Sequence, residues 1–185
     1  MADLRIKYRP EVLDQVWGND VVKKIWSGFV RSSSYPKSII LYGSYGVAKS
    51  SMARIFAKDI TSGNSYLGNG LFPKLYEVDA AHYDPIYTWQ YIHVMDMYAH
   101  EPIVIFIDEA QRLAEKAQDA FLKIIEDSPH LHFIFAASNL EKIDGGIQSR
   151  STKLNLKNPS APVLLAELSK IAQKENINIA DGALE

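Results

Sequence analysis

The sequence predicts an α/β domain in which helices cover both faces of a parallel sheet of five strands. Two observations predict this fold. Short apolar runs alternate with helical patterns along most of the chain, and the two central runs, Ile103–Ile107 and Phe133–Ala137, are apolar throughout, as strands buried on both faces are. Repeated strand–helix–strand units of this kind form parallel sheets, because the crossover helices lie against the two faces.

The strands and helices follow one another in a regular order. Apolar runs predict five strands, the last one less clearly than the others: Ile39–Leu41, Leu75–Val78, Ile103–Ile107, Phe133–Ala137 and Thr152–Leu156. Caps and apolar residues at helical spacing predict four helices, one before the first strand and three between strands: Asn19 or Asp20 to Val30, Lys49–Ile60, Pro85–Tyr98 and Ala110–Glu126. The polar, glycine-rich segment Thr61–Gly70 is predicted to be a surface loop.

The pattern breaks near residues 158–162, which contain two prolines. An amphipathic helix follows, with Leu164, Leu168, Ile171 and Ala172 on one face. We therefore expect a nucleotide-binding domain over residues 1–157 and the beginning of a second, helical unit over residues 158–185. One helix cannot form a core of its own, so this unit is incomplete or leans on the first domain.

The composition fits one globular domain with a short remainder. The chain has 185 residues, 47% of them hydrophobic and 23% charged. No apolar run is long enough to cross a bilayer and the N-terminus has no signal core, so we expect a cytoplasmic protein without a membrane partner. The net charge of −2 means that any contact with nucleic acid must come from a local basic patch.

The absence of cysteine limits the possible chemistry. Zero Cys excludes a disulfide framework, a thiolate zinc site and a cysteine nucleophile. The five histidines have no convincing ligand spacing. Any metal ion must therefore be held by oxygen atoms.

A phosphate-binding loop is predicted between the first strand and the next helix. It consists of Gly43, Ser44, Tyr45, Gly46, Val47, Ala48, Lys49 and Ser50, with Ser51 following. Small residues allow backbone N–H groups to curl around an oxyanion, Lys49 can reach the outer phosphates, and the Ser50 hydroxyl can bind Mg²⁺. Ala48 replaces the usual second glycine, which would cost about 1–2 kcal/mol if this position needs a positive φ. The alternative is an ordinary glycine-rich turn, which the flanking strand and helix disfavour.

Two carboxylates, Asp108 and Glu109, end the strand Ile103–Ile107. Open α/β sheets bind their ligands at this edge, so Asp108 is expected to hold Mg²⁺ directly or through water. Glu109 is then placed to orient and deprotonate a water that attacks the γ-phosphate. The simpler alternative is that the acidic pair caps the following helix.

Three further features leave alternatives open. Arg112, Lys116 and Lys123 fall at about 0°, 40° and 20° if 110–126 is one helix, and this stripe is equally consistent with a DNA-backbone contact and a solvated face. Asn139 ends the fourth strand beside the same edge, where asparagine is usually turn chemistry. Arg150 either forms a surface ion pair or reaches the nucleotide of a neighbouring subunit.

These pieces in this order resemble the P-loop ATPases of the AAA+ superfamily. The details are most similar to the clamp-loader branch, which comprises the bacterial gamma/tau-type subunits and the replication factor C subunits. The opening segment Lys7-Tyr8-Arg9-Pro10, followed by Leu13–Asn19, is similar to that of the branch. The stretch Phe121–Pro129, leading into Phe133–Asn139, is the most branch-specific part.

The resemblance implies a role for each of these residues. Lys49 and Ser50 become the Walker A residues, Asp108 and Glu109 the Walker B pair, and ATP and Mg²⁺ the cofactors. It implies that Tyr8, Arg9 and Pro10 lie near the adenine, that Asn139 is the first sensor, and that Arg150 is an arginine finger. The implied partners are other clamp-loader subunits in a ring, a sliding clamp, and primed double-stranded DNA along Arg112, Lys116 and Lys123.

The chain departs from that pattern at several points. Ala48 stands in the phosphate loop, Ser-Arg-Ser replaces Ser-Arg-Cys around Arg150, and Thr61–Gly70 stands where gamma-type subunits carry a four-cysteine zinc module. The chain ends before the lid helix with the second sensor arginine and before the collar domain, so we expect weak ATPase activity from it alone. Two alternatives remain: a structural clamp-loader subunit that binds nucleotide poorly, favoured by Ala48, and another AAA+ motor such as a branch-migration helicase.

Overall fold

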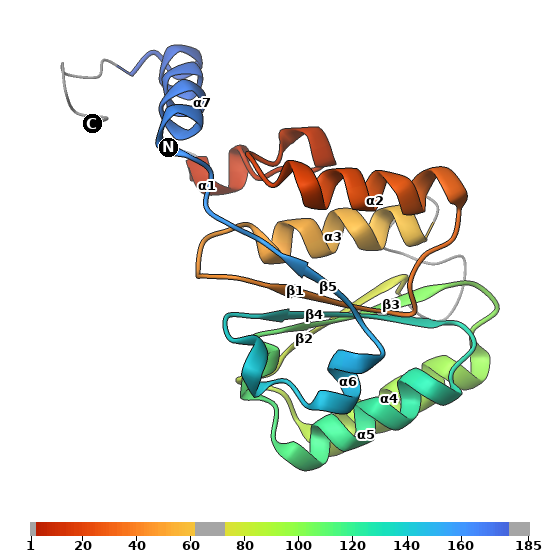
Figure 1. Cartoon of the computed structure of the whole chain (residues 1–185). Coiled ribbons are helices and arrows are strands. Elements are labelled where there is room, and N and C mark those ends of the chain that lie inside the picture. Colours follow the sequence, from red (N-terminus) through yellow and green to blue (C-terminus); the bar gives the residue numbers. More distant parts are fainter. Residues whose placement is uncertain (1–2, 62–72, 178–185) are drawn as a thin grey trace.

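The computed structural model describes residues 3–61 and 73–177, and its centre is one parallel sheet. The strand order is β2-β3-β4-β1-β5, and every neighbouring pair is parallel (Figure 1). The strands are β1 (Ser38–Tyr42), β2 (Leu75–Asp79), β3 (Ile103–Asp108), β4 (Leu131–Ala137) and β5 (Thr152–Asn155). The predicted fold class is confirmed.

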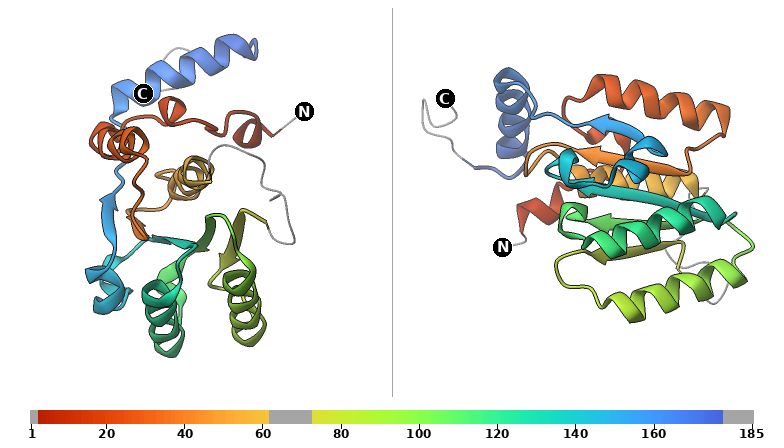
Figure 2. Two further views of the ribbon diagram at one scale, coloured as in Figure 1. Left: turned by 90° about the vertical axis from the view of Figure 1, so that its right-hand side faces the viewer. Right: turned by 60° about the horizontal axis from the view of Figure 1, so that its bottom comes forward.

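Helices cover both faces of this sheet. The described helices are α1 (Leu4–Lys7), α2 (Asp20–Ser32), α3 (Lys49–Ile60), α4 (Pro85–Tyr98), α5 (Glu115–Asp127), α6 (Gly145–Ser149) and α7 (Ala161–Lys174). Three 3₁₀ turns lie between them: η1 (Leu13–Gln15), η2 (Ala110–Arg112) and η3 (Leu140–Lys142). Figures 1 and 2 show α2 and α3 on one face of the sheet and α4, α5 and α6 on the other.

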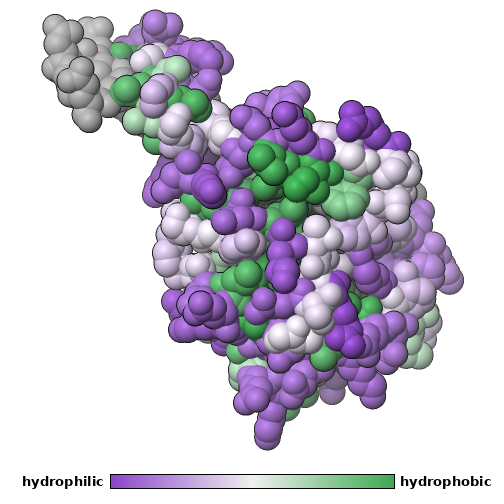
Figure 3. Space-filling view, viewed as in Figure 1, coloured by the Kyte–Doolittle hydropathy of each residue, from purple (hydrophilic) through white to green (hydrophobic). Residues whose placement is uncertain are grey.

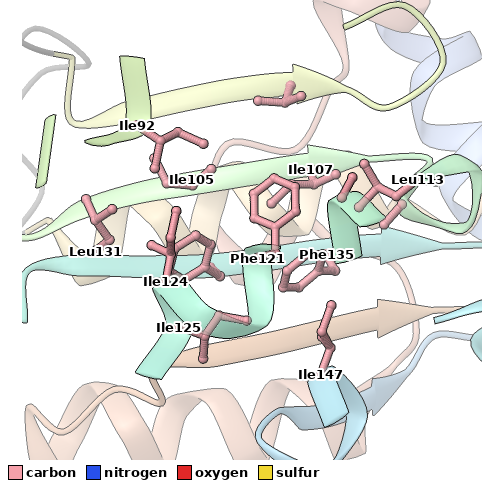
Figure 4. Close-up of a cluster of buried hydrophobic side chains, with 14 of the residues drawn as sticks. Ile92, Ile105, Ile107, Leu113, Phe121, Ile124, Ile125, Leu131, Phe135 and Ile147 are labelled. Carbon is pink, nitrogen blue, oxygen red and sulfur yellow. The ribbon is translucent and has the colours of Figure 1, made fainter. Parts of the chain in front are cut away.

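Alternate residues of the strands supply two separate hydrophobic cores. Ile39 and Leu41 of β1 face α2 and α3, whereas Ile40 between them belongs to the core under α4 and α5. Trp26 of α2 is fully buried in the first core, where its ring stacks on Phe56 at a centroid distance of 3.6 Å. In the second core, side chains of α5 such as Phe121 point at the strands (Figure 4).

The predicted strands agree with the structure to within two residues at each end. The predicted helix Ala110–Glu126 is wrong as a single element, because it consists of η2 and α5 with two extended residues, Leu113 and Ala114, between them. The buried side chain of Gln118 stabilises this break, since its Nε2 donates to the carbonyls of Leu113 and Lys142 at 3.2 and 3.1 Å. The predicted loop Thr61–Gly70 lies, apart from Thr61, outside the described residues.

Helix α7 lies beside the N-terminal segment, outside the two hydrophobic cores that flank the sheet (Figure 1). Ala172 is its one buried residue. The assignment of residues 158–185 to the start of a second unit remains a prediction, and residues 178–185 lie outside the described part.

The surface seen from the side of Figure 1 is mainly hydrophilic, with hydrophobic patches such as the one over α2, where Val21 and Ile25 are exposed (Figure 3). Among the described residues, no helix has the length and apolarity needed to cross a membrane. A cytoplasmic location stays a prediction.

Candidate ATP site

The loop between β1 and α3 adopts backbone conformations that favour small residues. Gly43 has a φ of +151°, and a Cβ at this position would come within 2.1 Å of the Leu156 carbonyl oxygen. Gly46 also has a positive φ, of 81°. Ala48 is left-handed, with φ 66° and ψ 26°, directly before α3. Ala48 therefore has the positive φ at which a methyl group costs about 1–2 kcal/mol.

Lys49 is the first residue of α3, and its ammonium group folds back over the loop. Its Nζ donates to the carbonyl oxygens of Gly43 at 2.8 Å and Ser44 at 2.7 Å. Burial lowers the pKa of Lys49, and the nearby carboxylates of Asp108 and Glu109 oppose that change. The Tyr45 ring lies beside the ammonium group but is 68% exposed, so it does not fill the loop.

Ser50 and Asp108 meet below the loop. The Ser50 hydroxyl donates to Asp108 Oδ2 at 2.7 Å, and Asp108 Oδ1 accepts the Glu109 backbone N–H at 2.9 Å. A hydroxyl and a carboxylate oxygen are ligands that Mg²⁺ accepts, so this pair fits the cation. Within the described ranges no three His, Cys, Asp or Glu side chains gather as a metal site. Phosphates and water would therefore have to complete the coordination.

Glu109 follows Asp108 in a left-handed conformation, with φ 51°. The turn η2 brings Arg112 back toward it, and Arg112 Nε lies 2.5 Å from Glu109 Oε2. The Glu109 carboxylate thus lies at the carboxyl edge of the sheet, next to Asp108, and its buried Oε2 accepts no hydrogen bond within the described residues.

The end of β4 lies at the same edge, since β4 pairs with both β1 and β3. Asn139 is exposed there and caps η3, because its Oδ1 accepts the Glu141 backbone N–H at 2.9 Å. The preceding backbone N–H, of Ser138, donates to Gln111 Oε1 at 3.1 Å. The turn after β3 and the turn after β4 are thus tied together beside the phosphate loop.

A cavity of about 420 Å³ borders the phosphate loop. Tyr8, Arg9 and Pro10 line it together with Gly46–Ala48 and Ser51, and their place near an adenine stays a prediction. Other lining residues come from the rest of the N-terminal segment and from the start of α7, namely Arg5, Gln15, Val16, Trp17, Asn19, Asn158, Pro159 and Leu164. The cavity is large enough for a planar base next to the loop.

Arg150 lies away from these groups. It precedes β5, whose first residue Thr152 pairs with Ile39 near the start of β1, whereas the phosphate loop follows the end of β1. The guanidinium pairs instead with Glu126, with Nη2 at 2.5 Å from Oε1. Arg150 is thus at the amino edge of the sheet and cannot reach the phosphate loop of its own chain.

Comparison with protein families decides the nature of this site. Residues 39–158 match the model of the ATPase family associated with various cellular activities (AAA). The chain belongs to the AAA family of ATPases. Membership implies ATP as the ligand of the phosphate loop.

Curated relatives of this AAA domain extend the likeness over nearly the whole chain. The replication factor C small subunit of Methanococcus vannielii is 32% identical over 97% of the chain and 56% of that protein. The DNA polymerase III subunit gamma of Buchnera aphidicola is 30% identical over 96% of the chain and 53% of that protein. The chain therefore spans about half the length of these relatives.

Solved structures share the fold of this AAA domain. The RuvB Holliday junction branch migration motor of Thermotoga maritima superposes with a TM-score of 0.73 over 96% of the chain and 58% of RuvB. At 19% sequence identity, this likeness concerns the fold alone.

The AAA domain does not present the predicted basic stripe as one helical face. Lys116 and Lys123 are exposed on α5, but Arg112 belongs to η2 and is engaged by Glu109. The angular argument for all three was wrong because it assumed an unbroken helix from Ala110. Any DNA contact made by α5 has to rest on its two lysines.

Some contacts of the AAA site were missed in the sequence. The ion pair of Arg112 with Glu109 is indicated by their spacing of three residues, but this spacing brings the side chains together only because η2 forms there. No such spacing indicates Gln111, which holds the turn after β4, or the cavity residues from 158–164, because they meet the site through tertiary packing.

Proposed function

We propose that this chain is the ATP-binding and ATP-hydrolysing part of a DNA polymerase clamp-loader subunit, which loads a sliding clamp onto primed DNA. One observation carries the proposal. The likeness to replication factor C small subunits and to DNA polymerase III gamma subunits covers 96–97% of the chain, with the phosphate loop and the acidic pair inside it. These relatives are about twice as long as the part of them that the chain covers.

The residues of the site divide the chemistry among them. Lys49 turns from the Gly43 and Ser44 carbonyls to the outer phosphates of ATP, and the loop N–H groups bind the remaining phosphate oxygens. Ser50 and Asp108 would hold Mg²⁺, which would neutralise charge on the phosphates. Glu109 orients the attacking water and accepts its proton, while Asn139 at the end of β4 assists in positioning that water.

Assembly into a ring completes the site. Arg150, at the amino edge of the sheet, stabilises the charge of the transition state at a neighbour's ATP, after its guanidinium leaves Glu126 and binds the phosphate.

The outer face of α4 supports a role in a complex, since it exposes the apolar side chains of Ile86, Tyr87, Met97 and Tyr98. Lys116 and Lys123 of α5 follow the DNA backbone.

The test separates binding from turnover. Calorimetric titration with ATP and Mg²⁺ is expected to show binding by the unmutated chain, no binding by Lys49→Ala, and retained binding by Glu109→Gln. In the complex of this protein with its partners, Glu109→Gln should abolish ATP turnover and clamp loading. A complex that binds a four-way junction but no sliding clamp would instead identify a branch-migration motor.

A second function, a structural subunit with little nucleotide binding, is favoured by one observation. Ala48 is left-handed where glycine would be unstrained, so the loop carries a cost that an ATP-binding loop does not need. Absence of binding at millimolar ATP in both the unmutated chain and Ala48→Gly would support this candidate and contradict the first.

A further inference from the structure

Helix α7 is attached to the rest of the molecule chiefly at its two ends, and the N-terminal segment makes both attachments. Before the helix, Asn19 Nδ2 donates to the Lys157 carbonyl at 3.0 Å, and Asn19 Oδ1 accepts the Lys157 N–H at 2.8 Å. After the helix, Glu175 Oε1 accepts the Lys7 ammonium at 2.6 Å and the Tyr8 hydroxyl at 2.5 Å. Between these ends only Ala172 of the helix is buried.

The space between the two elements shows why the second attachment matters. A hollow of about 510 Å³ separates the N-terminal segment from α7, with Lys7 and Tyr8 on one wall and Ile171 and Lys174 on the other. Ala172 is therefore the one buried residue that packs the C-terminal half of α7 against the rest of the molecule. The Glu175 carboxylate bridges the hollow at its far end, and the first attachment consists of the two hydrogen bonds between the Asn19 side chain and the Lys157 backbone.

Tyr8 connects this bridge to the ATP site. The residue lines the cavity next to the phosphate loop, opposite Val47 and Ala48, while its hydroxyl is bound by Glu175. Leu164, in the first turn of α7, lines the same cavity. The Glu175 carboxylate thus fixes two walls of the cavity: Tyr8 directly, and Leu164 through α7.

We infer that Glu175 is a positioning residue for nucleotide binding, which acts through the Tyr8 hydroxyl to hold the Tyr8 ring and the start of α7 against the cavity. This assignment rests on the proposed binding of ATP at the phosphate loop. Without the carboxylate, a nucleotide must itself order Tyr8 and α7 when it binds, and that ordering lowers the affinity.

Calorimetric titration of the chain with ATP and Mg²⁺ tests the assignment. Glu175→Ala and Tyr8→Phe are each expected to raise the Kd about 2- to 5-fold, the range for an exposed charged contact. The double variant should bind no more weakly than Glu175→Ala, because that substitution already removes the hydrogen bond of the Tyr8 hydroxyl. Glu175→Gln, whose amide oxygen still accepts the Tyr8 hydroxyl, should recover most of the affinity.

The matched control is Glu167→Ala, since Glu167 lies on the same helix and forms an ion pair with Lys170 at 2.6 Å; both residues line the hollow, but neither lines the cavity next to the phosphate loop. This variant should bind ATP like the unmutated chain. Equal Kd values for Glu175→Ala and the unmutated chain, or additive effects in the double variant, would overturn the assignment alone. No binding by the unmutated chain would overturn the proposed function, and the assignment with it.

A second measurement needs no nucleotide. Because the chain has no cysteine, spin labels can be placed through Lys24→Cys on α2 and Ala166→Cys on α7, both exposed positions. Electron–electron distances should be narrowly distributed in the otherwise unmutated chain and broader in Glu175→Ala. Identical distributions would show that the carboxylate does not hold α7, which would also overturn the assignment.

Discussion

Ala48 occupies a backbone conformation, φ 66°, that L-residues other than asparagine and aspartate seldom adopt. Ala48→Gly should relieve this strain. We expect a free energy of unfolding higher by about 0.5–1 kcal/mol, because the relief exceeds the entropy that glycine adds to the unfolded chain. Urea denaturation followed by circular dichroism measures this difference.

The control for Ala48→Gly is the same substitution where the backbone is helical. Ala120, inside α5, meets this condition, and Ala120→Gly should lower the free energy of unfolding by about 1 kcal/mol. A loss of stability in both variants would show that the left-handed conformation of Ala48 carries no strain.

His132 on β4 gives a second prediction for a single residue. Its Nδ1 donates to the Pro36 carbonyl at 3.0 Å, and burial lowers the pKa of the imidazole below its ordinary 6.5. The folded state disfavours the imidazolium, so the unfolded chain binds the proton more readily. Stability should therefore be unaffected well above pH 6.5 and should fall as the pH drops through this value toward the folded pKa.

The variant His132→Asn keeps an N–H for the Pro36 carbonyl and removes the titration. Between about pH 7.5 and about pH 5.5, the free energy of unfolding should decrease more for the unmutated chain than for the variant. Equal losses in both proteins would contradict the role of His132.

At the scale of elements, α5 shows how far local sequence can predict structure. The apolar spacing from Ala117 to Ile125 correctly indicates a buried helix face. Nothing at Leu113 or Ala114 signals a break, since neither glycine nor proline occurs there. The break depends on Gln118, which bonds to a carbonyl 24 residues away, and a single sequence does not contain that contact.

In the candidate ATP site, too, local segments could be predicted from the sequence, whereas contacts between distant residues could not. The phosphate loop and the acidic pair are continuous segments with their own backbone requirements, so the sequence alone indicated them. The partners of Tyr8 and Asn19 lie 167 and 138 residues away, and only the folded chain brings them together.

Helix α5 also carries a prediction about DNA. Lys116 and Lys123 are exposed on one side of it, about 10 Å apart along the helix axis. Lys116→Glu in the assembled complex should weaken binding to primed duplex DNA and reduce the slope of log K against log salt by about 1. Fluorescence anisotropy over a range of salt concentrations measures both quantities.

A lysine on the opposite face of the sheet provides the comparison for Lys116. Lys24→Glu on α2 changes the net charge equally and should leave the slope as it is in the unmutated complex. Equal slopes for Lys116→Glu and the unmutated complex would identify the exposed side of α5 as a solvated face.

At the scale of the whole molecule, Arg150 and the phosphate loop occupy opposite edges of the sheet. Arg150→Ala should leave ATP binding unchanged in the isolated chain. In the assembled complex it should lower the turnover number about 10³-fold or more, as loss of an arginine finger does in other phosphate-loop enzymes. Steady-state ATPase assays, with Arg31→Ala on α2 as the control, test this; an unchanged rate would assign Arg150 to the Glu126 ion pair only.

The separation of these two edges gives each subunit a polarity. Under the proposed role of Arg150, one end of each subunit would accept an arginine and the other would donate one, so the contact between subunits would be heterologous and head to tail. A stack that does not close into a circle has one terminal subunit whose ATP receives no arginine and another whose arginine serves no ATP. An open spiral would therefore always contain one ATP site without an arginine from a neighbour, and that site would lie at the gap in the ring.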